Sequence, residues 1–479
     1  MEPPNQPEPW AMSSTRRLFI TLAVGVSTTL FTIATTMVLV ALPTMSKDFN
    51  VDITIVQWVA LAFFIGVSSF HLPTGRLGDL FGRKRVYLIG YVITTIGFLG
   101  AVFSPGIYWL IAFRGLQGVG ASAIQANATA IMVSAYPPAR RGRAIGLYGS
   151  MSALGLALGP IVGGAILQVT EWPTMFAILV PWCVLGFLMG LASIPNSAIR
   201  ASGHFDYLST LLLTMTLGPI VIALNRVATH GWDNPLTLSF ICCFAISGFL
   251  FVKRQQSVES PLVDPSIFSS SMFKSGVIIA FVGFVAFSSV LLLMPFLIQN
   301  LMEVPVAQVG LLVSISWFVT AIFNFLSGPL VDKFGTRPVL SVGSILLAIC
   351  YLLVSRLDAS SAILHVVVIM ASIGFAQSFW MAPTNARILG SVLRHQLGLA
   401  GGFVAFARTF GFALGTAIWG GIFSFIALSG NDATIAVEAP TKFQETGFRT
   451  TFLIVAALSG LLAVYAVSTR ATSANQTDN

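Results

Sequence analysis

The sequence predicts an all-α integral membrane protein, from its composition, the length of its apolar runs and the placement of its charges. Hydrophobic residues make up 56% of the 479 residues, and charged residues only 9%. A soluble globular protein carries about 25% charged residues, so this chain cannot cover a surface that faces water. Backbone groups in lipid must be satisfied within their own segment, which favours helices, and the runs are too long and continuous for barrel strands.

The apolar runs predict fourteen membrane spans. A helix needs about 20 apolar residues to cross the hydrocarbon core. The first run is too long for a signal peptide and ends without a clear cleavage site, so it counts as a span. The run at 236–252 is short. The fourteen runs lie near residues 18–42, 54–74, 86–104, 107–134, 144–168, 174–195, 207–226, 236–252, 277–300, 307–330, 338–355, 361–384, 398–428 and 450–469.

The basic residues predict the orientation of the chain. With fourteen spans both termini share one side, and eighteen of the 25 Lys and Arg residues fall in segments on that side. Five fall on the other side, and Arg114 and Arg408 lie within spans. Basic loops stay in the cytoplasm, so we expect a multi-pass protein of the plasma or inner membrane with both termini cytoplasmic. Topology explains the net charge of +8, and nucleic-acid binding has no support.

The chain contains an internal repeat. "GRLGDLFGRKR" at 75–85 aligns with "GPLVDKFGTRP" at 328–338 at an offset of 253, and "GLALGP" at 155–160 aligns with "GFALGT" at 411–416 at an offset of 256. Two similar offsets indicate a duplicated chain. Parallel six-span halves occur in secondary transporters, which bind substrate between the halves near the midplane. The predicted division is a disordered tail (1–14), a six-helix half (15–200), an inserted helix pair (205–253), a second six-helix half (270–470) and a disordered tail (471–479).

Several motifs together resemble those of the major facilitator superfamily, and within it the fourteen-span drug:proton antiporters. Besides the stretch at 75–85, they are "RGLQGVGAS" (114–122), "GLALGPIVGG" (155–164), "FDYLS" (205–209) and "PLVDPSIF" (261–268). The resemblance covers about 15–470 and implies the major facilitator fold. It also implies export of small amphipathic molecules by alternating access, driven by an ion gradient that we expect to be protons. No cofactor is implied, and a monomer is the default expectation.

The stretch at 75–85 has two interpretations. Asp79 can pair with Arg76 or Arg83 if the helix continues, and such contacts can form a latch between two moving halves. The resemblance supports this interpretation, because the family's loop is understood as a conformational gate. The alternative is a cytoplasmic basic anchor without a gating role. The latch residues and their copies are Gly75, Asp79, Gly82, Arg83, Asp332 and Arg337.

Charged and polar residues within the spans are candidates for substrate binding or coupling. A charge in a span costs a few kcal/mol, so it faces the protein interior or a water-filled path. Gln117 and Gln125 share a helix face with Arg114, which the family assigns to proton coupling or substrate handling. The alternatives are structural: an arginine tied to backbone carbonyls, or packing. The candidates are Arg114, Gln117, Gln125, Arg408, Asn324 and Trp58.

The stretch at 155–164 predicts a tight helix seam or a hinge. Small residues at helical spacing let backbones approach closely, and proline frees a carbonyl and permits a bend. That this stretch indicates export follows from the resemblance alone. The residues are Gly155, Gly159, Pro160, Gly163 and Gly164.

One position departs from the resemblance. The antiporters carry an Asp and an Asn in span 1, where this chain has Ala34 and Leu39, and no acid lies securely within any span. Arg114 and Arg408 then give the core a positive character, which favours neutral or anionic molecules over cations. A facilitator or importer of a neutral or anionic metabolite without proton antiport therefore stays open. No nucleotide-binding loop, catalytic set or metal cluster is recognisable, so we expect no enzyme.

Overall fold

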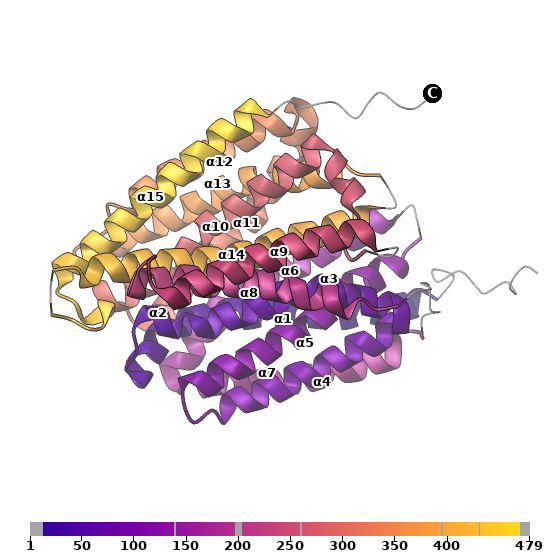
Figure 1. The fold of residues 1–479 in the computed structure, drawn as a ribbon, viewed down its shortest axis with the longest axis horizontal. Coiled ribbons are helices and arrows are strands. Elements are labelled where there is room, and N and C mark those ends of the chain that lie inside the picture. Colours follow the sequence, from indigo (N-terminus) through magenta and orange to yellow (C-terminus); the bar gives the residue numbers. More distant parts are fainter. Residues whose placement is uncertain are drawn as a thin grey trace, which may run out of the picture.

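The computed structural model describes residues 13–137, 140–196, 204–258, 261–393, 396–430 and 432–469. The predicted tails at 1–14 and 471–479 lie outside these residues, apart from Ser13 and Ser14. The described chain is helical, with short connections (Figure 1). Its first seven helices are α1 (Ser14–Phe49), α2 (Ile53–Val56), α3 (Trp58–Phe81), α4 (Arg83–Val102), α5 (Ile107–Ser134), α6 (Arg141–Val169) and α7 (Pro173–Ser193).

Eight further helices complete the described chain. Two of them, α8 (Tyr207–His230) and α9 (Pro235–Ser257), form the inserted pair. The last six are α10 (Ser271–Phe296), α11 (Val306–Phe334), α12 (Thr336–Val354), α13 (Ile363–Leu389), α14 (Leu397–Leu428) and α15 (Thr441–Ser468).

The predicted fold class is confirmed. Thirteen helices of the described chain are long and apolar enough to cross a membrane, with α2 and α3 counted as one span. The remaining long helix, α5, has 28 residues and packs between α3 and α4. Its buried Arg114, Gln117, Gln125 and Asn127 lower its mean hydropathy, because polar side chains take the place of apolar ones. It is the fourteenth long helix of the described chain.

The same helix pairings recur in the first and last six spans. In the first set, which we call the N half, α1 packs against α6, α3 and α4 pack against α5, and α4 packs against α7. In the last set, the C half, α10 packs against α14, α11 and α12 pack against α13, and α12 packs against α15. The exact bounds of the predicted division stay a prediction.

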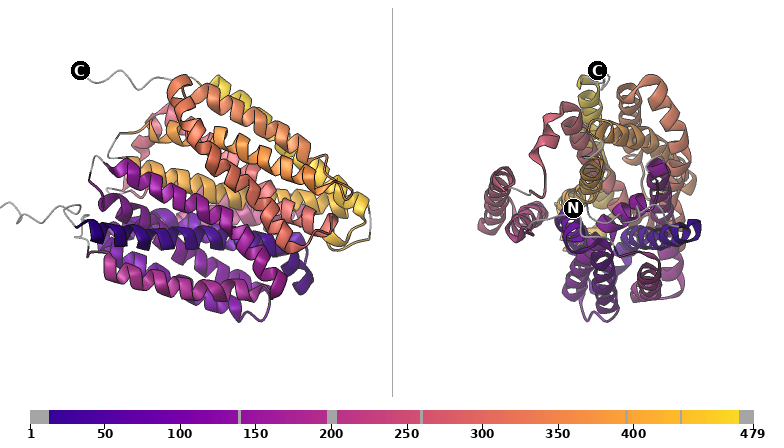
Figure 2. Two further views of the ribbon diagram at one scale, coloured as in Figure 1. Left: turned by 180° about the vertical axis from the view of Figure 1, so that it is seen from behind. Right: turned by 90° about the vertical axis from the view of Figure 1, so that its right-hand side faces the viewer.

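The two halves meet along a seam. Helix α6 lies against α11, α3 lies against α14, and α1 touches α10. The inserted pair covers one side of this seam, because α8 packs against α14 and α3, while α9 packs on α8 (Figure 2). We call the end of the bundle that carries Ser13 and Thr469 the terminal face, and the end that carries α2 and residues 429–440 the opposite face (Figure 1).

Both copies of the repeated motif end a helix in the same way. Gly82 ends α3 with φ of 96°, and Gly335 ends α11 with φ of 82°. Side chains with a Cβ rarely adopt this left-handed region, which explains why both copies carry glycine at this position. The next helix begins directly afterwards in each case, so the chain reverses with almost no loop at the terminal face.

Candidate functional site

The seam is fastened at the opposite face by a buried carboxylate. Asp52 caps α2, since its Oδ2 accepts hydrogen bonds from the Thr54 backbone N–H (3.1 Å) and hydroxyl (2.8 Å). The same carboxylate reaches the C half, where it accepts from the Ser424 hydroxyl of α14 at 2.8 Å and the Ala436 N–H at 2.7 Å. Asp52 is only 9% exposed, so these bonds are shielded from water.

Close backbone contacts also hold the opposite face shut. A Cβ on Gly310 of α11 would overlap the Pro160 carbonyl of α6, and a Cβ on Gly164 would lie 2.7 Å from the Val306 carbonyl oxygen. Nearby, the Gln299 carboxamide donates to the Thr44 hydroxyl of α1 at 3.1 Å. Gln299 lies in a π-helical turn, Leu297–Leu301, that follows α10. The two halves are therefore in direct contact near the opposite face.

Several glycines toward the terminal face have no close neighbour. Gly146 and Gly149 of α6, Gly328 of α11, and Gly398 and Gly401 of α14 lie in the parts of these helices nearest the terminal face. A Cβ added at any of these five positions would meet no atom within 4 Å. On α14 this holds for Gly401 but not for Gly402, where an added Cβ would lie 3.4 Å from Leu72 of α3.

Aromatic side chains fill the closed part of the seam. Phe412 of α14 contacts Phe64 of the N half with ring centroids 5.7 Å apart. Edge-on contacts continue this cluster inside the C half, and the indole N–H groups of Trp317 and Trp380 are buried without an acceptor among the described residues. The aromatic cluster consists of Phe64, Phe284, Phe287, Trp317, Trp380 and Phe412.

The predicted residue Arg408 lies in the seam. It is half-buried on α14 and interacts electrostatically with His71 of α3 and Tyr148 of α6. Directly beside it, the Ser68 hydroxyl of α3 donates to the Thr409 hydroxyl at 3.0 Å. The two electrostatic neighbours of Arg408 thus both belong to the N half. Neither His71 nor Tyr148 is among the candidates that the sequence predicts.

Arg114 and Gln117 lie inside the N half instead. Arg114 is 1% exposed, donates from Nε to the Val59 carbonyl at 2.9 Å and stacks over the Phe63 ring at 4.3 Å. Its Nη1 donates to Gln117 Oε1 at 2.6 Å, and Gln117 Nε2 donates to the Gly97 carbonyl at 2.8 Å. These bonds tie α5 to α3 and α4, which is the geometry of the structural alternative. A transport role for the pair stays a prediction.

The other three polar candidates lie apart from one another. Trp58 donates from its indole nitrogen to Asn225 Oδ1 of α8 at 3.0 Å, and Asn225 donates to the Thr54 carbonyl at 3.1 Å. Trp58 therefore joins the inserted pair to the N half. Gln125 Nε2 and Asn324 Oδ1 are buried without a hydrogen-bond partner among the described residues. No sequence signal pointed to Asn225, because its partners lie about 170 residues away.

The predicted latch residues make contacts within their own halves in this state. Arg83 Nη2 forms an ion pair with Asp79 Oδ1 at 2.9 Å, and both side chains are partly exposed. In the second copy, Arg337 donates to the Val467 carbonyl of α15, and Asp332 is exposed. Gly75 has only a loose neighbour, because a Cβ added there would lie 3.8 Å from the Ala126 methyl group.

The glycine stretch of α6 faces two different helices. Cβ atoms on Gly155 and Gly159 would overlap Thr32 and Thr36 of α1, and one on Gly163 would lie 2.9 Å from Met37. These three glycines pack α6 on α1 within the N half. Gly164, by contrast, faces α11, so the stretch contributes to both a helix contact and the seam between the halves.

Comparisons with known proteins agree with this architecture. The family model described as "Major Facilitator Superfamily" matches residues 24–302 and again 276–478. The riboflavin transporter RibZ of Clostridioides difficile (strain 630) is 28% identical over 386 residues, which are 80% of this chain and 83% of RibZ. The multidrug resistance protein Stp of Mycobacterium tuberculosis (strain CDC 1551 / Oshkosh) is 27% identical over 408 residues, 85% of this chain and 76% of Stp. The crystal structure of the peptide transporter POT in complex with sulfate superimposes with a TM-score of 0.69 at 13% identity, covering 94% of this chain and 93% of POT.

Proposed function

Since the chain belongs to the major facilitator superfamily, whose members are membrane transporters and not enzymes, we propose that it exports small amphipathic molecules in exchange for protons. It would work by alternating access in the plasma or inner membrane, as a monomer and without a cofactor. The excess of basic residues on the side of the termini supports a cytoplasmic terminal face. The substrate would enter the seam from the cytoplasm.

The observation that carries this proposal is the asymmetry of the seam. An exporter must expose its binding site to the cytoplasm while the outer side is closed, and then reverse. Asp52, Gly164 and Gly310 close the opposite face, whereas Gly328 and Gly401 face open space near the terminal face. The contacts at Asp52, Gly164 and Gly310 are hydrogen bonds or backbone-to-backbone contacts, so we expect them to break and re-form as the halves rock.

The predicted latch fits the second state of this cycle. Asp79 and Arg83 of the N half and Asp332 and Arg337 of the C half lie at the terminal face and stay within their own halves here. When the terminal face closes, these charged groups come within reach of the other half. We propose that they then hold that face shut, as the predicted gating role requires.

A second function is supported by two observations. One relative is named a riboflavin transporter, while others are named for drug resistance. In addition, the position of the expected span 1 acid holds Ala34, which is buried against the aromatic wall around Phe31 and Phe63. A facilitator or importer of a neutral or anionic metabolite needs no carboxylate there. The two functions differ in whether protons move with the substrate.

Proteoliposomes loaded with a pH-sensitive dye separate these functions. A gradient of each member of a panel of neutral, anionic and cationic amphiphiles is imposed, and the internal pH is recorded. Antiport predicts a pH change that depends on both substrate and protein and is absent from protein-free vesicles. Substrate movement without any pH change would contradict proton antiport and support the facilitator. Failure of every compound to move would contradict transport of this class of molecule.

A further inference from the structure

Arg408 is a cation without a counter-charge. Among the described residues it forms no hydrogen bond or ion pair, in contrast to the other two arginines buried within helices. Arg114 donates to the Val59 carbonyl and to Gln117, and Arg387 donates from Nε and Nη2 to the Ser275 hydroxyl at 3.1 and 2.9 Å. A guanidinium in a low-dielectric site is stable only when it is paired or hydrated. Arg408 therefore has binding capacity that the protein itself does not use.

Neighbouring contacts fix the position of Arg408 between the halves. The hydrogen bond from Ser68 to Thr409 and the approach of Leu72 to Gly402, 3.4 Å from a Cβ there, both join α3 to α14. His71 lies between Ser68 and Leu72 on α3, and its Nδ1 is buried without a partner among the described residues. Two groups able to bind an anion, one from each half, thus meet at the same place in the seam.

Glycines without close neighbours lie near Arg408 on its terminal-face side. Tyr148 of α6 contributes a third polar group and is flanked by Gly146 and Gly149, which face empty space. On α14, Gly401 lies two helical turns before Arg408 on the same face and also faces empty space. A molecule entering from the terminal face would meet Arg408 as the first charge along α14.

The surroundings contain no carboxylate to compete for this cation. Within α3 the one acid is Asp79, which lies eight residues from His71 and is paired with Arg83, and the described parts of α6 and α14 contain no acid. One turn beyond Arg408 on the same face of α14 is Phe412, the centre of the aromatic cluster. One face of α14 therefore carries, in order from the terminal face, Gly401 without a close neighbour, the cation Arg408 and the aromatic ring of Phe412.

We propose that Arg408 and His71 bind the acidic group of an amphipathic organic anion, and that the apolar body of this molecule packs against the aromatic cluster around Phe412. The planar guanidinium fork matches a carboxylate, sulfonate or phosphate monoester, and hydrogen bonds between ionised groups are about twice as strong as neutral ones. Because the two residues belong to different halves, the bound anion bridges the seam. The inference rests on the proposed transport function and names its substrate class.

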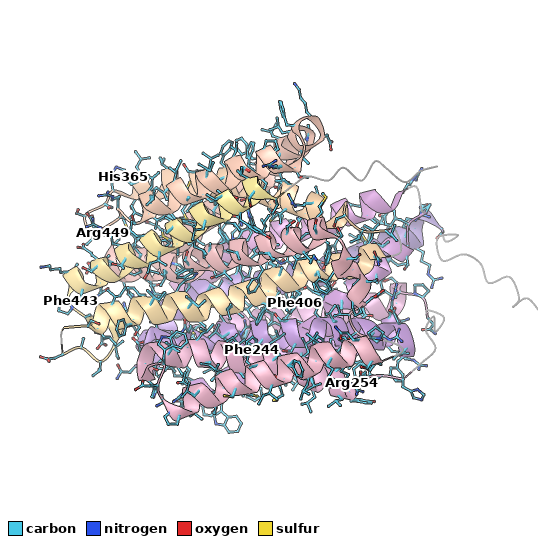
Figure 3. All side chains as sticks on the ribbon, turned by 45° about the horizontal axis from the view of Figure 1, so that its top comes forward. Phe244, Arg254, His365, Phe406, Phe443 and Arg449 are labelled. Atoms are coloured by element: carbon cyan, nitrogen blue, oxygen red, sulfur yellow. The ribbon has the colours of Figure 1, made fainter. Side chains whose placement is uncertain are left out.

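Equilibrium binding to the full-length protein in nanodiscs tests this assignment. The probes are naphthalene-1-carboxylate and two analogues of the same ring system, the neutral carboxamide and the cationic methylamine. The wild-type protein should bind the carboxylate about tenfold more tightly than either analogue, as a charge-assisted pair requires. Arg408→Gln should remove this preference and leave carboxamide binding unchanged. Arg449→Gln, which removes an exposed arginine of α15 at the opposite face (Figure 3), is the matched control and should keep it.

Two results would overturn the assignment. The first is an equal affinity of the wild-type protein for the carboxylate and the carboxamide. This test uses the wild-type protein alone, so it does not depend on whether a variant folds. An equal loss of all three probes in Arg408→Gln is the other, because it would indicate a structural arginine. Arg408→Lys keeps the charge but loses the planar fork, so it should retain a carboxylate preference that is weaker than that of the wild-type protein. The binding assay uses no gradient, so its result does not depend on the proposed export. If no compound were exported from proteoliposomes, the anion preference could still be measured. If only neutral compounds were exported, the proposed transport would stand and the proposed substrate class would be contradicted.

Discussion

The two ends of the seam use opposite kinds of contact. At the opposite face, Asp52 accepts four hydrogen bonds, two of them from the C half, and the backbones of α6 and α11 touch at Gly310. At the terminal face, the ion pairs Asp79–Arg83 and Asp206–Arg254 each join residues within one half or within the inserted pair. These two ion pairs thus lie at the terminal face and do not cross the seam, whereas the carboxylate of Asp52 joins the two halves at the opposite face. We therefore expect the contacts at the opposite face to set the resting state.

The largest effect is expected from filling the contact at Gly310. A leucine there would overlap the Pro160 carbonyl, and because this is backbone it cannot move aside. Overpacking of this kind costs about 3 kcal/mol. The population of the state with a closed opposite face should therefore fall by more than about tenfold. The measurement is the distance between spin labels at Lys47→Cys and Lys442→Cys, on a background without the four native cysteines. The variant should show the longer distance.

Gly328→Leu, on the same helix, is the matched control. No atom lies within 4 Å of a Cβ at Gly328, so the substitution should leave the short distance between the opposite-face labels in place. It should instead hinder closure of the terminal face and slow transport. If Gly310→Leu and Gly328→Leu changed the label distance equally, the two ends of the seam would not differ as described.

The next effect is expected from removing the charge of Asp52. Asp52→Asn keeps a good helix N-cap, so α2 should stay folded. Its bonds to Ser424 and Ala436 lose charge assistance, which costs about 1–2 kcal/mol and shifts the equilibrium about tenfold toward an open opposite face. The same label pair measures this shift. Asp48→Asn, at an exposed acid of α1 on the same face, should have no effect.

The sequence predicted the fold well because the fold depends on local patterns. Apolar runs located the long helices, and the repeat explained why Gly82 and Gly335 end α3 and α11 with the same backbone geometry. The length of the apolar run also predicted a span at α5, although Arg114 and Gln117 lower the mean hydropathy of that helix. Helix ends were less accurate: α15 begins at Thr441, before the predicted 450, because the helix continues through the polar residues Glu445 and Arg449.

The seam contacts were not predictable in the same way. Asp52 reads as a loop acid next to a helix, and its C-half partners Ser424 and Ala436 lie more than 370 residues away. Trp58 was chosen as a candidate for lining a substrate cavity, but its partner Asn225 belongs to the inserted pair. Arg114 and Arg408 looked alike as charges within spans, and only tertiary packing separates the hydrogen-bonded one from the one without a partner among the described residues.

A smaller effect concerns the inserted pair. Burial by itself raises the pKa of Asp206, but hydrogen bonds from Arg254 and Ser209 outweigh it, so the pKa lies below its usual value. Arg254 holds this carboxylate through Nε and Nη2 at 2.9–3.1 Å and lies near the terminal face (Figure 3). A lowered pKa means that the stabilisation is complete at neutral pH and is lost as the pH falls below about 4. Asp206→Asn should lower the free energy of unfolding at pH 7 by at most about 1 kcal/mol. Because the variant has no carboxylate to protonate here, its free energy of unfolding should also fall less on acidification than that of the wild-type protein.

This prediction also bears on the comparison of the two faces. Asp206 and Arg254 both belong to the inserted pair, so breaking their ion pair should not change the label distance at the opposite face. A change of that distance in Asp206→Asn at neutral pH would show that the inserted pair controls the seam, and not only that it covers it.

The smallest effect in the resting state is expected from the predicted latch. Asp79 and Arg83 are partly exposed and four residues apart, and such pairs contribute at most about 0.5 kcal/mol. Arg83→Gln should therefore leave both the thermal stability and the opposite-face distance unchanged. If the latch acts when the terminal face closes, the same variant should slow net transport severalfold, because it destabilises the other end state alone. If Arg83→Gln instead lengthened the distance between the opposite-face labels as Asp52→Asn does, Arg83 would already act across the seam in this state. Contacts at both faces would then stabilise the closed opposite face.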